Sequence, residues 1–417
     1  MVRKSVLDNG IRLVTESIPS AETVSIGFWI EVGSAYESTK NCGYSHFLEH
    51  MLFKGAGDLN AFDIAMKMDG VGGVMNAFTT RESTCFYVNV AARHTAMAVD
   101  LLAKMFYEPS FDSLELEREK QVILQEIMMY EDAPEEALHD HFMSALWPTH
   151  PVGRPIIGSV ETIQPITRRD LVSYYKKHFT TDRLIIAAAG KVNHNQLRRS
   201  LKKLPARVCT GSPPVQRPMP APRFSVRCEK KKLEQVHLIL SLPGIPRFHP
   251  DTFAHALFNA VMGGGMSSRL YQRLRENEGI CYSIYSFKTA FMKQGVVNVY
   301  SATSMGYLKK VLHSLREELD KLANEGIPDA ELLRAKEQIK GNMILGRESV
   351  ESRMNRLAYL EMYLKRFISI KEVMARIDAV DSVLIQKIIN DVFSPGKLAV
   401  STVGPAGHVN NIEKWYS

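Results

Sequence analysis

The stretch His46-Phe47-Leu48-Glu49-His50 places two imidazoles and a carboxylate within one short segment that we expect to be helical. Residues four apart lie one turn apart on the same face of a helix, so His46 and His50 can both reach a single metal ion. Glu49 lies beside them, where its carboxylate can take a proton from an attacking water. The stretch therefore predicts a helical metal site with a carboxylate placed for acid-base chemistry.

The spacing H-x-x-E-H reverses the H-E-x-x-H signature of zinc peptidases and is typical of inverzincins. A motif this short also occurs by chance, so the hypothesis needs a third ligand. The best candidate is Glu126, in the run Leu114–Tyr130, which contains strong helix formers and no Gly or Pro. Glu119, two turns earlier on the same face, could orient a ligand or compensate the metal charge. The alternative is that both are solvated glutamates on an acidic helix.

On these residues the chain resembles the pitrilysin or insulinase family of zinc metallopeptidases, which includes the mitochondrial processing peptidase and its bacterial relatives. His46, Glu49 and His50 fit the inverted motif of that family. Glu126 falls where the third zinc ligand is expected, and Glu119 matches a glutamate that assists catalysis without binding zinc. The resemblance implies one Zn²⁺ per chain, with Glu49 as the general base. Further agreement comes from residues 73–80, 150–154 and 263–270.

The resemblance also implies substrate contacts. The segment Asn76-Ala77-Phe78 corresponds to a strand edge that pairs with the substrate backbone near the zinc, and such pairing is largely independent of substrate sequence. Arg275 and Tyr282 match an Arg and Tyr pair from the non-catalytic half, which can donate hydrogen bonds to a peptide carbonyl or to the oxyanion. Without the resemblance, the first segment is equally consistent with a buried turn. Without the resemblance, Arg275 is consistent with a surface charge and Tyr282 with a half-buried aromatic residue.

Composition bounds the class of protein and its surroundings. The 417 residues are 45% hydrophobic and 23% charged, which predicts a soluble globular chain of two or more domains. No run of eighteen apolar residues occurs, and Met1–Gly10 lacks an apolar signal segment, so we expect no membrane association and no export. Five cysteines without metal-type spacing indicate a reducing compartment, and we expect the cytoplasm.

The net charge of +7 raises the question of a nucleic-acid partner. The run Lys230-Lys231-Lys232 has no interleaved aromatic residues and belongs to no known binding motif, so it is interpreted as a solvated face. We expect no nucleic-acid partner.

A proline-rich segment, 206–224, predicts a stiff linker between two halves of the chain. Residues 1–205 form the predicted catalytic, zinc-binding half, and residues 225–417 form a second, metal-free half that contributes substrate contacts. Strands are expected at Thr23–Val32, Thr84–Val90, Val236–Leu242 and Gly295–Val299. Helices are expected over 41–54, 60–70, 94–107, 112–131 and 168–178, and near 250–262, 266–276, 306–324, 328–345 and 371–391.

The two halves look like divergent copies of one unit. Residues 117–126 can be laid on 333–342, which pairs Glu126 with Asn342, and residues 255–259 then occupy roughly the place of the H-x-x-E-H segment. If this overlay is right, the second copy has lost its metal site. The predicted fold class is α+β, with two homologous halves that each contain a mainly antiparallel β-sheet packed with α-helices. The resemblance implies a chamber of four such halves, so we expect a clamshell homodimer.

Together these features predict a zinc-dependent endopeptidase that cleaves unfolded peptides or presequence-like segments in an enclosed chamber. One alternative is a non-catalytic peptide-binding or assembly subunit of the same fold. Another is an enzyme that is active only with a different partner chain. The presence of the metal motif and the Arg275/Tyr282 pair in one chain favours a self-sufficient homodimer.

Overall fold

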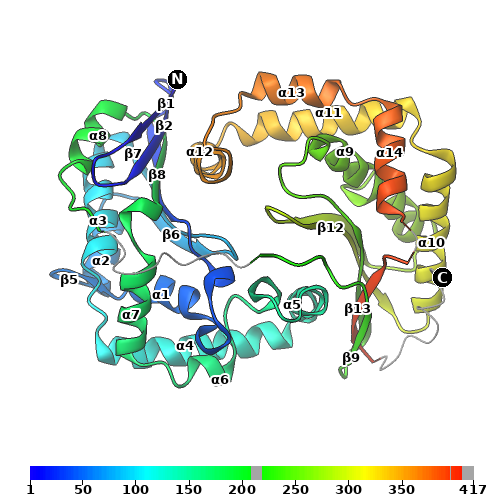
Figure 1. The fold of residues 1–417 in the computed structure, drawn as a ribbon, viewed down its shortest axis with the longest axis horizontal. Coiled ribbons are helices and arrows are strands. Elements are labelled where there is room, and N and C mark those ends of the chain that lie inside the picture. The colour runs from blue at the N-terminus through cyan, green and yellow to red at the C-terminus, as the bar shows by residue number, and fades with distance from the viewer. Residues whose placement is uncertain (208–217, 395, 406–417) are drawn as a thin grey trace. The chain divides into compact units, whose positions relative to one another are not determined.

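The computed structural model describes residues 1–207, 218–394 and 396–405, which form two compact units, each built around one large β-sheet (Figure 1). The first unit comprises Met1–Met128, Arg154–Arg217 and Ile344–Ile368. The second unit comprises Met129–Gly153, Pro218–Met343 and Ser369–Ser417. The units therefore differ from the predicted contiguous halves, because each contains one segment from the other half. Most of the predicted linker, residues 208–217, lies outside the described residues.

The first sheet has six strands in the order β1-β2-β8-β3-β7-β6, and the second has five in the order β11-β12-β10-β13-β9. Neighbouring strands are antiparallel except for one parallel pair in each sheet, β2 with β8 and β13 with β9. The prediction of mainly antiparallel sheets is confirmed. The strands are β1 Val2–Val6, β2 Arg12–Ser17, β3 Thr23–Ile30, β6 Val74–Thr79, β7 Thr84–Ala91, β8 Leu184–Gly190, β9 Val226–Lys230, β10 Gln235–Pro243, β11 Ser283–Ala290, β12 Gly295–Ser304 and β13 Ala399–Gly404.

The two sheets share one topology. Read from the β6 edge, the first sheet runs β6-β7-β3-β8-β2, and the second, read from β11, runs β11-β12-β10-β13-β9. The strands occur along the chain in the same relative order in both sheets, and the parallel pair occupies the same position. This agreement supports the prediction that the halves are divergent copies of one unit.

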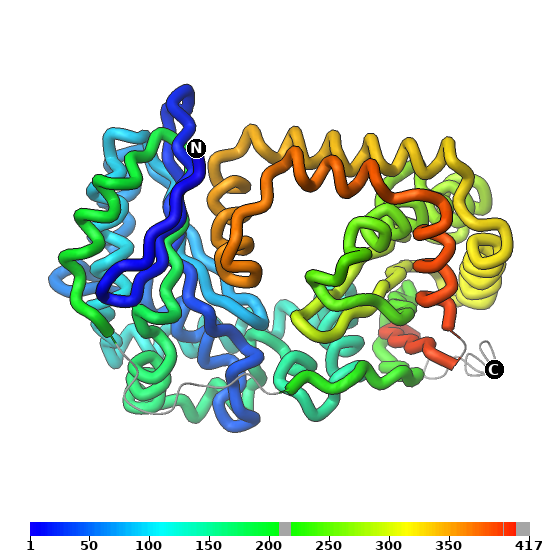
Figure 2. Tube along the Cα trace, turned by 45° about the horizontal axis from the view of Figure 1, so that its top comes forward, coloured from blue at the N-terminus to red at the C-terminus, as the bar shows by residue number. Residues whose placement is uncertain are grey.

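Helix α12, Val350–Leu364, covers one face of the first sheet, although its sequence lies in the second half of the chain (Figure 2). It packs on β8, β3 and β2. A Cβ atom added to Gly27 would lie 2.7 Å from Met354 Sδ, so the glycine permits close approach of the helix. Trp29 Nε1 donates a hydrogen bond to Met354 Sδ at 3.3 Å. The opposite face of the same strands joins the main core of the unit.

The second sheet has the reciprocal arrangement. Helix α5, Pro134–Leu146, comes from the first half of the sequence and packs on β13 and β10. Its apolar stripe, Leu138, Phe142 and Leu146, is spaced at four residues and is buried. Each sheet is thus covered on one face by a helix from the other half of the chain.

Most predicted helices are confirmed within a few residues. The prediction of a single helix over 371–391 is wrong, because two helices, α13 and α14, form there. The Asp381 side chain accepts a hydrogen bond from the Leu384 backbone N–H and so caps the start of the second one. The segment near 266–276 forms a π-helix at Tyr271–Asn277. Helices α5, α6, α8 and α12 were not predicted. The remaining elements are α1 Tyr44–Leu52, α2 Ala61–Asp69, α3 Thr95–Tyr107, α4 Ser113–Asp132, α6 Val160–Ile163, α7 Arg168–His178, α8 His194–Leu201, α9 Thr252–Gly263, α10 Leu308–Glu325, α11 Asp329–Gly346, α13 Ile370–Asp378, α14 Ser382–Val392, β4 Gly55–Ala56 and β5 Leu59–Asn60.

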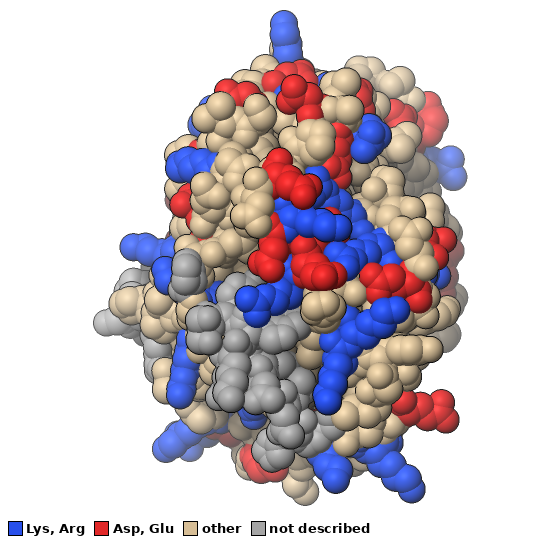
Figure 3. All heavy atoms as spheres, turned by 90° about the vertical axis from the view of Figure 1, so that its right-hand side faces the viewer, with Lys and Arg blue, Asp and Glu red and all other residues tan. Residues whose placement is uncertain are grey.

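Charged side chains of both signs are interspersed on the face of the molecule shown in Figure 3. Some of the opposite charges in the second unit form ion pairs: Arg269 contacts Glu331 at 2.7 Å, and Arg273 contacts Glu278 at 3.0 Å. Within the described ranges, none of the helices combines the length and apolar character needed to cross a bilayer.

Candidate metal centre

A buried carboxylate fixes the start of helix α1, which carries three of the predicted site residues. Glu37, 1% exposed, accepts hydrogen bonds from the backbone N–H groups of Gly43 at 2.8 Å and Ser45 at 2.7 Å. Gly43 has a φ of +91°, and a Cβ atom there would lie 2.7 Å from Ile157 O, so this turn requires glycine. Burial raises the pKa of Glu37 to about 7, although both hydrogen bonds and the charge of Arg154 act in the opposite direction.

The apolar face of α1 anchors the helix. Phe47, Leu48 and Met51 are fully buried in the core of the first unit. The helical period therefore turns His46 and His50 to the other side, where both are partly exposed and their ring centroids lie 4.7 Å apart.

Helix α4 brings the predicted third ligand to these histidines. Glu126 Oε2 lies 3.8 Å from His46 Nε2 and 3.6 Å from His50 Nε2. One ligand atom from each of the three residues lies within 4.8 Å of the other two. The structure thus brings together His46, His50 and Glu126, which are separated by up to 80 positions in the sequence.

The donor set fits zinc. Two imidazole nitrogens and one carboxylate are the protein ligands of a catalytic zinc site that keeps a further position open. Glu126 Oε2 is buried and accepts no hydrogen bond from any described residue, as expected for an oxygen that faces a cation. Burial, followed by the charge of His50, lowers the pKa of His46 to about 3, which keeps this imidazole neutral and able to bind metal.

Glu119 lies against the outer side of His50. Its Oε2 is 2.9 Å from His50 Nδ1, and its Oε1 is 2.7 Å from Lys54 Nζ. Burial alone would raise the pKa of Glu119, but the hydrogen bonds to His50 and Lys54 outweigh it and lower that pKa. An ionised carboxylate only accepts hydrogen bonds, so His50 carries its proton on Nδ1 and leaves Nε2 free toward Glu126.

Glu49 points toward the edge of the first sheet. Its Oε2 accepts a hydrogen bond from Thr79 Oγ1 at 2.5 Å. Burial raises the pKa of Glu49, and the Thr79 hydrogen bond and the charge of His50 only partly oppose this effect. A carboxylate whose pKa moves toward neutrality is suited to accept and return a proton.

Strand β6 carries the predicted substrate contacts Asn76, Ala77 and Phe78 and ends at Thr79. It is the last strand of the first sheet and pairs only with β7 among the described residues. The Phe78 ring packs on Trp29, with centroids 5.2 Å apart. The structure therefore places a strand edge beside the carboxylate of Glu49.

Arg275 and Tyr282 lie together in the second unit. The Arg275 guanidinium is 5.3 Å from the centroid of the Tyr282 ring and 5.0 Å from that of Tyr271. The Tyr282 side chain is 75% exposed. The pair is thus a cation–π unit whose phenol side chain is largely exposed.

Sequence reasoning missed three residues that support this centre: Glu37, Lys54 and Thr79. A signal exists for Lys54, because it follows His50 by four residues. Glu37 and Thr79 act through contacts that depend on the packing of separate elements. Thr79 lies within residues 73–80, which agree with the family, but its contact with Glu49 cannot be inferred from that segment.

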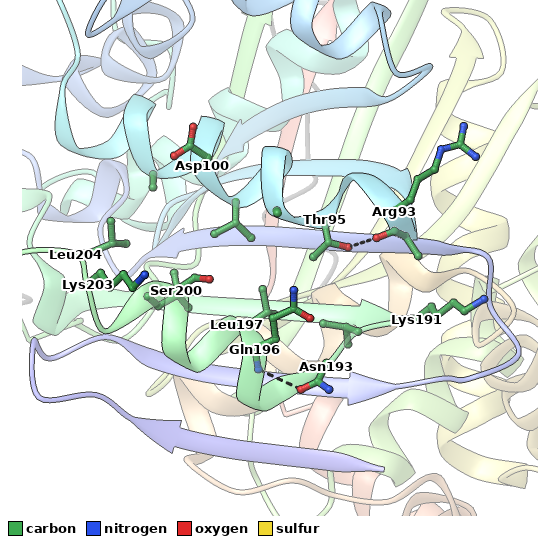
Figure 4. A pocket seen from close by; sticks show the side chains of 16 residues that line it. Arg93, Thr95, Asp100, Lys191, Asn193, Gln196, Leu197, Ser200, Lys203 and Leu204 are labelled. Atoms are coloured by element: carbon green, nitrogen blue, oxygen red, sulfur yellow. Dashed lines mark hydrogen bonds between the residues drawn. The ribbon is translucent and has the colours of Figure 1, made fainter.

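A pocket of about 450 Å³ lies elsewhere in the first unit, between α3 and α8 (Figure 4). Arg93, Asp100, Lys191 and Lys203 are among its polar residues, and Val99 and Leu197 among its apolar ones. None of the predicted site residues lines it.

A duplicated α/β unit with a two-histidine, one-carboxylate cluster in its first copy defines a class of metal-site proteins. The chain belongs to the insulinase family of peptidases, and the predicted resemblance is confirmed. Residues 12–160 match the family model described as insulinase (peptidase family M16), and residues 165–339 match the model described as the peptidase M16 inactive domain.

Several relatives span the whole chain. It is 34% identical over 411 residues to an uncharacterized zinc protease of Bacillus subtilis, covering 98% of this chain and 100% of that protein. It is 31% identical over 427 residues to a probable mitochondrial-processing peptidase subunit beta of Arabidopsis thaliana, covering 99% of this chain and 80% of the relative.

Solved structures have the same fold. A structure described as a peptidase M16 inactive domain from Pseudomonas fluorescens aligns with a TM-score of 0.89 at 19% identity, over 97% of this chain and 98% of that one. A protease from Helicobacter pylori aligns with a TM-score of 0.89 at 20% identity, over 97% and 99% of the two chains. At these identities the likeness concerns the fold alone.

Proposed function

We propose that this protein is a zinc-dependent endopeptidase that cleaves unfolded peptides. The observation that carries the proposal is the convergence of His46, His50 and Glu126 beside the carboxylate of Glu49. Family membership and relatives named zinc proteases support zinc as the metal, with one ion per chain. Zinc bound there would supply a Lewis acid that polarises the scissile carbonyl and activates water.

In this proposal Glu49 is the general base. It takes the proton of the attacking water and returns a proton to the leaving amine. The Thr79 hydroxyl holds one oxygen of Glu49 and leaves the other free for this transfer. Glu119 orients His50 through the Nδ1 hydrogen bond and binds no metal itself.

The β6 edge is proposed to bind the substrate. Asn76, Ala77 and Phe78 would pair with an extended peptide through main-chain hydrogen bonds, which carry little sequence preference. Folded proteins present few free strands, so unfolded or presequence-like segments are the expected substrates. Arg275 and Tyr282 are proposed to donate hydrogen bonds to the bound peptide or to the oxyanion.

A homodimer and a cytoplasmic location remain predictions. The described cysteines, Cys42, Cys85, Cys228 and Cys281, form no disulfides with one another, which is consistent with a reducing compartment. Sedimentation of the purified protein, combined with a peptidase assay of each species, tests the dimer.

The function is tested by digesting a mixed pool of unstructured peptides, about fifteen to thirty residues long, with the wild type and with Glu49→Gln. Mass spectrometry of the products and metal analysis of both proteins are the readouts. Internal cleavage by the wild type alone, with equal zinc in both, is the expected result. Absence of cleavage by zinc-loaded wild type would overturn the self-sufficient enzyme and favour an activity that needs a different partner chain, or a binding role.

A further inference from the structure

Lys54 lies just beyond the C-terminal end of the metal-site helix. The backbone N–H of Phe53 donates to His50 O and that of Lys54 donates to Met51 O, both at 3.1 Å, so the turn after α1 is closed by hydrogen bonds. This turn holds Lys54 next to His50. The side chain of Lys54 is 28% exposed, and its ammonium lies 2.7 Å from Glu119 Oε1.

Glu119 is the group that Lys54 reaches, and it is buried. Its side chain is 6% exposed, and its two oxygens have different partners: Oε1 contacts Lys54 and Oε2 contacts His50 Nδ1 at 2.9 Å. A chain of contacts therefore runs from the ammonium through the carboxylate to the imidazole of a proposed metal ligand. The far nitrogen of that imidazole, His50 Nε2, faces Glu126.

The burial of Glu119 gives the Lys54 contact its weight. An ion pair between two exposed side chains contributes little, because water screens it. A carboxylate inside a protein needs a compensating cation, and removal of that cation is costly. Without Lys54, Glu119 would keep His50 as its only side-chain hydrogen-bond partner among the described residues, and its second oxygen would be left without the ammonium.

We propose that Lys54 is a positioning residue for the metal centre. It holds Glu119 in the orientation in which Oε2 accepts the Nδ1 hydrogen of His50, so that Nε2 is presented to zinc. This inference rests on the proposed function, because it assigns to Lys54 a share of the zinc affinity. Among the described residues the ammonium of Lys54 pairs with Glu119 and with no proposed ligand atom, so Lys54 acts through Glu119.

The test is zinc affinity, measured by competition with a chromogenic chelator well below the unfolding temperature. Lys54→Met is expected to weaken zinc binding about tenfold or more, the range for residues that support metal ligands. Lys54→Arg keeps a cation in reach of Glu119 and is expected to recover most of that loss. Lys104→Met is the matched control, because it removes a lysine that pairs with the exposed Asp58, and no change in affinity is expected.

A double mutant separates positioning from a general structural effect. In the Glu119→Gln background, Lys54→Met is expected to change zinc affinity by less than about threefold, because the path through Glu119 is already broken. Additive effects of the two substitutions, or a wild-type affinity in Lys54→Met, would overturn the proposal. If the wild type itself binds no zinc, the proposed function fails instead. Melting of the metal-free proteins reports any loss of fold separately.

Discussion

Helices α1 and α9 occupy equivalent places in the two units. Along the chain, α1 follows β3 and α9 follows β10, and these two strands correspond in the shared sheet topology. Helix α1 presents His46 and His50 at a partly exposed surface, whereas α9 buries its histidine, His255, at 2% exposure. Both ring nitrogens of His255 lack a hydrogen bond to any described residue. The same helix therefore carries candidate metal ligands in one copy and packs into the core in the other.

This comparison shows that the fold does not depend on the metal chemistry. In the overlay of the two copies, Phe258 takes the place of Glu49, and it is fully buried in the second unit. Buried apolar residues hold α9 in place together with hydrogen bonds between Asn259 and Ser286, just as buried apolar residues hold the inner face of α1. The chemistry of the first copy is added on the outer face of a helix that the fold already fixes.

The largest expected effect comes from removing the third ligand in the first copy. Glu126→Gln should abolish stoichiometric zinc binding and reduce peptide cleavage by at least about a hundredfold, because an amide is a poor zinc ligand. Metal analysis and a peptide assay provide the readouts. The matched control is Asn342→Gln at the overlaid position in the second copy, which should keep both properties. Loss of zinc in both variants would contradict the comparison.

Helix α12 should contribute as much to the stability of the first unit as the core residues of that unit do. Met354→Ala in α12 removes a fully buried side chain from the face that contains Trp29. The expected loss is about 2–5 kcal/mol in the free energy of unfolding, because a cavity is left behind. Thermal or urea unfolding measures it. Met266, 73% exposed, is the control, and Met266→Ala should cost less than about 0.5 kcal/mol.

The buried histidine of α9 should give the second unit an acid sensitivity. Burial, followed by the charge of Lys288, lowers the pKa of His255 from 6.5 to about 4. Between these two pH values the unfolded chain binds more protons than the folded one, so stability falls as the pH drops from 6.5 to 4. His255→Leu should show a smaller fall in urea unfolding and should retain zinc. An unchanged pH slope would contradict this assignment.

Glu37, which accepts hydrogen bonds from the first turn of α1, should affect the pH dependence of stability in the opposite direction to His255, and this effect should be the smallest of those predicted. Because burial raises the pKa of Glu37 from 4.5 to about 7, the folded state binds the extra proton within this range. Its contribution to stability is therefore present at low pH and declines as the pH rises from 4.5 to 7. Glu37→Gln should remove this component of the slope. The urea series used for His255→Leu measures it, and a steeper decline in the variant would argue against the cap.

The sequence identified the three residues that the structure brings together as candidate metal ligands, because their spacing and helical context can be recognised locally. His46 and His50 are one turn apart, and Glu126 lies in a long uninterrupted helix, so each could be found from local pattern. The duplication was visible in the same way. Periodicity reports which face of a helix is apolar but does not report which sheet that face meets.

For this reason the sequence did not predict that α12 covers the first sheet and α5 the second. The buried positions of α12, Met354, Leu357 and Ala358, follow a helical spacing, but their partners Trp29 and Ala187 lie more than 150 residues away. The contacts of Glu49 with Thr79 and of Glu119 with Lys54 likewise depend on tertiary packing. Such pairs become visible only when separate elements are placed side by side.

Because α12 and α5 each cover the sheet of the other half of the chain, the two halves of the gene cannot be separated freely. A shortened gene that encoded only residues 1–205 would lack α12 and would leave Trp29, Ile185 and Ala187 uncovered on one face of the first sheet. A gene for the second half alone would lack α5 in the same way. Neither copy can be lost or inherited separately without exposing an apolar sheet. The copy without the metal motif is thus needed for the fold of the first unit, apart from any part that it has in substrate binding.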